Sequence, residues 1–245
     1  MSGHSKWATI KHAKGAADAK RGQMFTKLIK EISIAARMGG GSMDGNPRLR
    51  TAVIKARAAN MPKDNIDRAI KKGTGELEGV NYEELVYEAF APGGIAIFIE
   101  VLTDNKNRAA ADIRNILTRS GGQLATTGSV SRLFKRMGVI TLDGEKYTED
   151  AVMEVAIEGG AEDVAASDGI VEVTSAPEDF ESVVNALQAK EFETMSAEIN
   201  MVADVEVTLD NEATAKALKL IDKLEENEDV QHVYTNLAVP DDYPG

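Results

Sequence analysis

The first part of the chain carries apolar residues at helical spacing. Between Lys20 and Met38 they recur every three or four residues and share one helix face. Asn46, a favourable N-cap residue, precedes a second such segment, and Pro62, which suits a first helical turn, opens a third that stops at Gly73. The pattern predicts three short helices that pack as a bundle with an Ala-rich interior.

The rest of the chain alternates between strand and helix patterns. Strands at 82–90 and 95–102 precede a helix that is capped near Asn105 and runs to about Arg119. The expected order then becomes strand, helix, two strands, helix and strand, at 134–142, 148–158, 163–167, 169–174, 177–188 and 195–202. A final strand, helix and strand follow at 205–209, 211–226 and 230–237.

The order of elements between 134 and 202 is the β-α-β-β-α-β arrangement of a ferredoxin-like module. If the last three elements extended that module, the segment 82–119 would be one helix short of a comparable fold. We therefore predict an α+β protein with an N-terminal three-helix basic bundle and two α/β modules, at least one ferredoxin-like. The predicted domains are a basic arm and helical bundle at 1–75, a discontinuous α/β domain at 76–131 plus 204–245, and an inserted ferredoxin-like acidic domain at 132–203.

Charge is distributed unevenly along the chain. Up to Lys72 there are 16 Lys and Arg against 5 Asp and Glu, whereas the remainder has 12 against 35 and the whole chain a net charge of −12. Such an asymmetry is typical of a basic nucleic-acid-binding module on an acidic body. Between Asp143 and Glu206 only two bases accompany 18 acids. We interpret this stretch as a solvated face, and the alternative is a surface that orients the molecule on a polyanion.

The basic part of the chain supplies the candidate nucleic-acid-binding residues. The segment before Arg21 lacks a sustained apolar period, so we expect an arm that neutralises phosphates, with Trp7 available to stack on a base. The alternatives are a solvated tail and ordinary solvated helix faces, but such faces usually mix acids among the bases. The candidates are Lys6, Trp7, Lys11, His12, Lys14, Lys20, Arg21, Lys27, Lys30, Arg37, Arg48, Arg50, Lys55, Arg57, Lys63, Arg68, Lys71 and Lys72.

Few residues offer catalytic chemistry. The chain has no Cys, so a disulfide, a catalytic thiol and a thiolate metal site are excluded, and its three His residues are scattered. The Gly-bearing stretch 126–131 lacks the Lys-Ser or Lys-Thr ending of a phosphate-binding P-loop. We predict a protein that is not an enzyme and takes no cofactor, metal or small-molecule substrate. A divalent-metal hydrolase on the acidic body and a protein–protein adaptor remain as alternatives.

No apolar run approaches the roughly 18 residues that a membrane-spanning helix needs. No signal-peptide core follows the first Lys. We therefore expect a cytoplasmic protein without a membrane partner.

Several strings in this sequence resemble the YebC family, and the likeness extends over essentially the whole chain. They are Gly3–Trp7, Ile10–His12, Lys20–Gly22, Lys27–Glu31, Ala35–Arg37, Asn60–Ile66, Arg68–Gly73, Tyr87–Ala89 and Gly128–Ser131. The resemblance implies a three-domain, DNA-binding transcriptional regulator. It also implies a relation to a mitochondrial activator of translation and to bacterial proteins linked to ribosomes stalled on proline-rich nascent chains.

The residues themselves leave the kind of nucleic acid open. A DNA reader usually offers a recognition helix with Arg, Asn or Gln directed at base edges, and none of the three basic helices shows a clear set. An irregular basic arm with one Trp suits a structured or partly single-stranded RNA. DNA and ribosomal RNA, with the ribosome as a possible partner, therefore both stand as expected targets.

Overall fold

Three α-helices form the N-terminal bundle: α2 (Asp18–Gly39), α3 (Pro47–Ala58) and α4 (Lys63–Thr74). The computed structural model describes residues 18–240 and 242–244, and side chains from residue 21 on. Asn46 caps α3 as expected, because its Oδ1 accepts from the Leu49 N–H at 3.1 Å. Its Nδ2 also donates to the carbonyl oxygens of Ala35 and Gly40, each at 2.8 Å, so one side chain joins the end of α2 to the start of α3.

The bundle interior is built from small and aliphatic side chains. Ile32, Leu49 and Ile66 belong to a cluster that also contains five buried alanines and several partly buried residues. Helices α2 and α4 approach closely at Gly73, where an added Cβ would lie 2.3 Å from the Ser33 carbonyl oxygen. The close approach therefore depends on the absence of a side chain at Gly73 and on the small side chain of Ala36, which is part of the Ala-rich interior predicted from the sequence.

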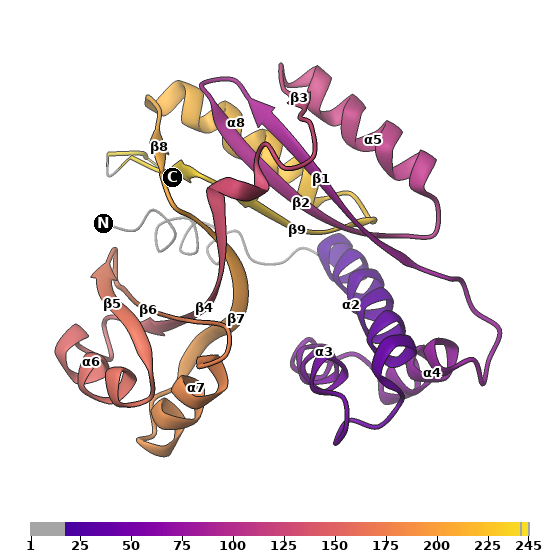
Figure 1. Cartoon of the computed structure of the whole chain (residues 1–245), viewed down its shortest axis with the longest axis horizontal. Helices are drawn as coiled ribbons and strands as arrows, with labels where there is room; N and C mark the ends of the chain where they lie inside the picture. The colour runs from indigo at the N-terminus through magenta and orange to yellow at the C-terminus, as the bar shows by residue number, and fades with distance from the viewer. Residues whose placement is uncertain (1–17, 241, 245) are drawn as a thin grey trace.

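A four-stranded antiparallel sheet forms the middle of the molecule, in the order β3-β1-β2-β9. Helices α5 and α8 pack against one another and share the core of this sheet, on its upper side in Figure 1. Ile97, Ile99, Ile113, Leu117 and Ile221 are fully buried in that core. The elements are β1 (Glu83–Ala91), β2 (Ile95–Thr103), α5 (Lys106–Arg119), β3 (Gln123–Leu124), α8 (Asn211–Glu225) and β9 (Val230–Thr235).

A second four-stranded antiparallel sheet has the order β5-β6-β4-β7, which is the ferredoxin-like order. Helices α6 and α7 share its core. Asp168 and Gly169 both have positive φ and form the two-residue turn between β5 and β6. The elements are η1 (Ser131–Leu133), β4 (Phe134–Asp143), α6 (Glu149–Glu158), β5 (Ala161–Ser167), β6 (Ile170–Ser175), α7 (Phe180–Ala189) and β7 (Thr194–Ala203).

The predicted fold class is confirmed, and the differences are local. The strand expected at 205–209 is reduced to β8 (Val207–Thr208), which pairs in parallel with β10 (Leu237–Ala238). Val205 is 69% exposed, so its side chain does not pack against the protein as that of a core strand would. The strand expected at 230–237 divides at Asn236, whose Oδ1 accepts from the Ala96 N–H at 2.8 Å.

The C-terminal segment returns to the middle sheet, since β9 pairs with β2 and α8 lies beside α5. β8 pairs with β10 and not within the sheet that contains β4. We therefore propose the division into residues 1–75, 76–131 plus 204–245, and 132–203. From here on we call these the bundle, the middle domain and the inserted domain.

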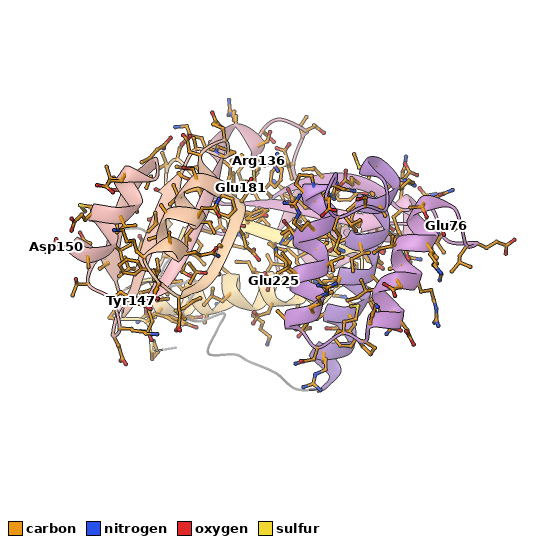
Figure 2. All side chains as sticks on the ribbon, turned by 90° about the horizontal axis from the view of Figure 1, so that it is seen from below. Glu76, Arg136, Tyr147, Asp150, Glu181 and Glu225 are labelled. Atoms are coloured by element: carbon orange, nitrogen blue, oxygen red, sulfur yellow. The ribbon has the colours of Figure 1, made fainter. Side chains whose placement is uncertain are left out.

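The middle and inserted domains share an apolar cluster, whereas the bundle has its own. Phe98 and Tyr234 of the middle sheet lie beside Phe134 at the start of β4, with Met201 of β7 packed on the same cluster. The bundle cluster has no member in common with any other cluster of the described residues. Figure 2 shows the bundle and the inserted domain on opposite sides, with Glu225 of α8 labelled between them.

Candidate nucleic-acid interface

Five cations of the bundle are exposed and form no ion pair with any residue that the structure describes. They are Arg57 at the end of α3, and Lys63, Arg68, Lys71 and Lys72 on α4. On α4 the buried residues Ile66 and Ala69 lie on the opposite side of the helix from Arg68, because each residue advances the face by about 100°. Asp64 and Asp67 share the exposed side, so α4 as a whole keeps a modest positive charge.

Other predicted site residues make contacts within the protein. Lys27 donates through Nζ to the Glu225 carbonyl oxygen at 2.5 Å, and Arg37 donates through Nη2 to the Tyr82 carbonyl oxygen at 2.5 Å. Lys55 pairs with Glu198 of β7 at 2.7 Å. These three residues therefore help to hold the bundle against the other two domains.

The arginines near the start of α3 are also engaged. Arg48 binds both oxygens of Glu31, at 2.7 and 3.1 Å, and also pairs with Glu84 of β1. The hydrogen bond to Glu31 is the main reason that the pKa of Arg48 is raised, with Glu84 adding to it and burial opposing it. Arg50 donates to the carbonyl oxygens of Met43 and Asp44. Of the three arginines on α3, only Arg57 has no such contact among the described residues.

A buried ionic contact anchors α2 to the middle domain. Asp229, 3% exposed, accepts from Lys30 Nζ at 2.7 Å, and Lys30 is itself only 6% exposed. Arg108 of α5 binds the same carboxylate through Nε at 3.1 Å and Nη2 at 2.9 Å. Lys30 Nζ also donates to the Glu228 carbonyl oxygen at 2.8 Å. We call Lys30, Arg108 and Asp229 the anchor; nothing in the local sequence pattern distinguishes Asp229 from the other acids.

The candidates of the N-terminal arm fall largely outside the described part of the chain. Lys6, Trp7, Lys11, His12 and Lys14 precede residue 18, and the side chain of Lys20 is likewise outside it. Arg21 lies exposed in the first turn of α2. Contact of all these residues with nucleic acid stays a prediction.

The Gly-bearing connection at 126–131 has a partner that sequence reasoning missed. The carboxylate of Glu88, 5% exposed in β1, accepts from the backbone N–H groups of Gly128 at 2.7 Å and Ser131 at 3.0 Å, and from that of Val130. Burial raises the pKa of Glu88, but these backbone donors outweigh it, so the pKa lies below its usual range. A loop whose amides already bind a carboxylate is occupied by the protein itself and does not offer them to a phosphate.

Two observations on the described residues concern metal and small-molecule binding. No group of three or more His, Asp or Glu in residues 18–240 is arranged to hold a metal ion. A shallow hollow of about 350 Å³ lies between the start of α6 and the β5–β6 turn, lined by residues such as Tyr147, Glu149 and Asp168. No helix in the described part is long and apolar enough to cross a bilayer.

Comparison with known families covers nearly the whole chain. Residues 5–76 match the TACO1/YebC protein N-terminal domain, and residues 82–237 match the TACO1/YebC second and third domain. The first match covers most of the bundle, and the second begins within the middle domain and includes the inserted domain.

Individual relatives agree with this result. A probable transcriptional regulatory protein of Treponema denticola is 66% identical over 99% of this chain and 98% of its own length. One from Treponema pallidum is 65% identical over 98% of each chain. The crystal structure of a conserved hypothetical protein from Aquifex aeolicus, 42% identical, superposes with a TM-score of 0.84 over 93% of this chain and 94% of that one. Sequence and structure together show that the chain belongs to the TACO1/YebC family, whose close relatives here carry the name of transcriptional regulatory proteins.

Proposed function

We propose that this chain is a non-enzymatic regulator of gene expression that binds nucleic acid through phosphate contacts of its bundle and N-terminal arm. The observation that carries the proposal is the set of five exposed bundle cations, from Arg57 to Lys72, that have no ion pair among the described residues. They belong to the one part of the chain whose charge is positive. The names of the relatives support the regulatory role.

The arrangement of the arginines on α3 favours contact with the phosphate backbone of a nucleic acid over direct reading of its bases. Arg48 and Arg50 are engaged within the protein, which leaves Arg57 as the one open arginine on α3 in the described structure. Discrimination between bases generally requires several side chains that reach base edges from one helix. We therefore propose weak sequence preference and affinity that falls steeply with salt.

Two targets follow from different observations. The names of the relatives favour promoter DNA. Helix α3 does not offer several unengaged side chains that could reach base edges. This favours a structured RNA such as ribosomal RNA, whose folded surface presents many phosphates as well as unstacked bases. A role in translation on the ribosome follows from the second target and a role in transcription from the first.

Sedimentation of a cell lysate separates these targets. The lysate is spun at moderate salt after treatment with RNase, DNase or neither, and the distribution of the protein is measured. Sedimentation with ribosomes that RNase abolishes supports the RNA target, and an RNase-resistant promoter footprint supports DNA. A variant with Gln at Arg57, Lys63, Arg68, Lys71 and Lys72 should lose either association. The control carries Gln at Lys146, Lys190, Lys216, Lys219 and Lys223 of the other domains, and it should keep the association. If the protein stays in the supernatant under every condition, the proposal is wrong.

A further inference from the structure

Two partly exposed ion pairs join the bundle to the rest of the protein. Lys55 of α3 pairs with Glu198 of the inserted domain at 2.7 Å, with side chains 38% and 35% exposed. Arg48 pairs with Glu84 of the middle domain, again with both side chains partly exposed. We call these two contacts the closing pairs. In each of them, a carboxylate of another domain contacts a bundle cation. Lys55 forms no other ion pair among the described residues, whereas Arg48 also binds Glu31 within the bundle.

The bundle is built to move as a unit. Its apolar cluster is separate from the others, and the linker at 75–81 is exposed at every residue. The anchor at Asp229 differs from the closing pairs because its carboxylate and Lys30 are both buried, where salt screens an ion pair much less. The rest of the bundle can therefore turn away from Glu84 and Glu198 about α2, which Lys30, Lys27 and Arg37 keep attached to the middle domain.

We propose that the closing pairs are an autoinhibitory contact, in which Glu84 and Glu198 stand in for phosphates and hold the bundle closed until a polyanion displaces them. This inference rests on the proposed function, since the displacing ligand is a nucleic-acid backbone. Partly exposed pairs contribute little each, so a backbone that presents many phosphates competes with them successfully. Opening adds Lys55 to the five cations that are already exposed, and it removes the Glu84 carboxylate from Arg48, which keeps its contact with Glu31.

The first test compares two double variants of equal charge. Glu84→Gln with Glu198→Gln removes both closing carboxylates, whereas Glu154→Gln with Glu181→Gln removes two exposed carboxylates of the inserted domain that make no ion pair among the described residues. Binding of a labelled duplex of about 20 base pairs and of an RNA hairpin is measured at several salt concentrations.

We expect the closing-pair variant to bind about two- to twentyfold more tightly than the wild type, since each partly exposed pair is worth a small factor. The control should show only the smaller gain that the loss of two distant negative charges produces. Equal affinities of the two double variants for both probes would overturn the proposal.

The second test follows the movement directly. The chain has no Cys, so Ser42→Cys before α3 and Ser182→Cys on α7 give two exposed positions for a fluorescent donor and acceptor. Energy transfer should fall when the duplex or hairpin is added, and also when salt is raised without nucleic acid. The closing-pair variant should show low energy transfer before and after nucleic acid or salt is added. The control variant should resemble the wild type. Transfer that stays constant through the salt titration would show that the pairs do not close the molecule.

The two tests separate the two proposals. If neither probe binds the wild type, the proposed function is wrong, and the autoinhibitory contact, which requires a displacing polyanion, is wrong with it. If the probes bind but transfer does not change, the proposed function stands and the autoinhibitory contact is wrong.

Discussion

Replacing Asp229 tests whether the anchor holds the bundle and middle domain together. Asp229→Ala leaves Lys30 buried without its carboxylate and removes one of the two carboxylates that Arg108 binds, the other being Asp104. Breaking a buried ion pair on one side costs roughly 3 to 5 kcal/mol, because the remaining charge is desolvated and unpaired. Lys30→Met should cost less, since Arg108 still binds both oxygens of Asp229. The double variant should cost less than the sum of the two single ones.

Hydrogen exchange followed by mass spectrometry measures this effect locally. Amides of β2 and β9 flank the anchor, and Asp229→Ala should reduce their protection about 100-fold or more, given ~1.4 kcal/mol for each factor of ten. Glu212→Gln serves as the control, because it breaks the exposed pair with Lys216 and should leave protection unchanged. If Asp229→Ala and the control give the same amide protection in β2 and β9, the anchor does not stabilise the contact between the bundle and the middle domain.

Three further predictions concern stability. Glu88→Ala should destabilise the middle domain by about 3 kcal/mol or more at neutral pH, because three N–H groups, of which that of Val130 is buried, lose a charged acceptor. The folded pKa of Glu88 lies below its unfolded value, so the wild-type advantage, measured by chemical denaturation, should shrink as pH falls through the folded pKa. Burial raises the pKa of Glu100, the nearby Glu31 and Glu84 raise it further, and Arg136 opposes them. Because the folded pKa lies above the ordinary Glu value of 4.5, the wild type loses stability as pH rises above 4.5 and Glu100 ionises. Glu100→Gln should therefore raise the Tm near neutral pH and not in acid, and a lower Tm at pH 7 would contradict this. Gly73→Ala should destabilise the bundle by roughly 1 to 3 kcal/mol in a thermal melt, because the new Cβ meets the Ser33 carbonyl oxygen, whereas Gly22→Ala has open space and should not.

The fold was predictable because its signals are local. The cap at Asn46, the turn at Asp168 and Gly169, and the end of α4 before Gly75 each depend on a few adjacent residues. The strand expected from Val205 was overestimated because alternation alone does not show whether a neighbouring strand is available for pairing.

The site was less predictable because its contacts join distant parts of the chain. The sequence shows that Lys30, Lys55 and Lys71 are all basic, but not that Lys30 and Lys55 meet Asp229 and Glu198 while Lys71 stays exposed. Those pairings depend on how the bundle packs against the other two domains. The spacing of apolar residues within a helix does not show which distant residues the helix will meet. The same holds for Glu88, which lies 40 residues from the loop amide of Gly128 that it binds.

The salt dependence of binding tests the central proposal most directly. Association of the wild type with duplex DNA and with single-stranded RNA is measured over a range of salt, and the slope of log affinity against log salt is compared with that of the variant carrying Gln at Arg57, Lys63, Arg68, Lys71 and Lys72. Five lost phosphate contacts should reduce the magnitude of the slope by about 4 to 5 for duplex DNA and by about 3 to 4 for single strands. A slope that is unchanged by these five substitutions would contradict the assignment of the bundle as the nucleic-acid-binding surface.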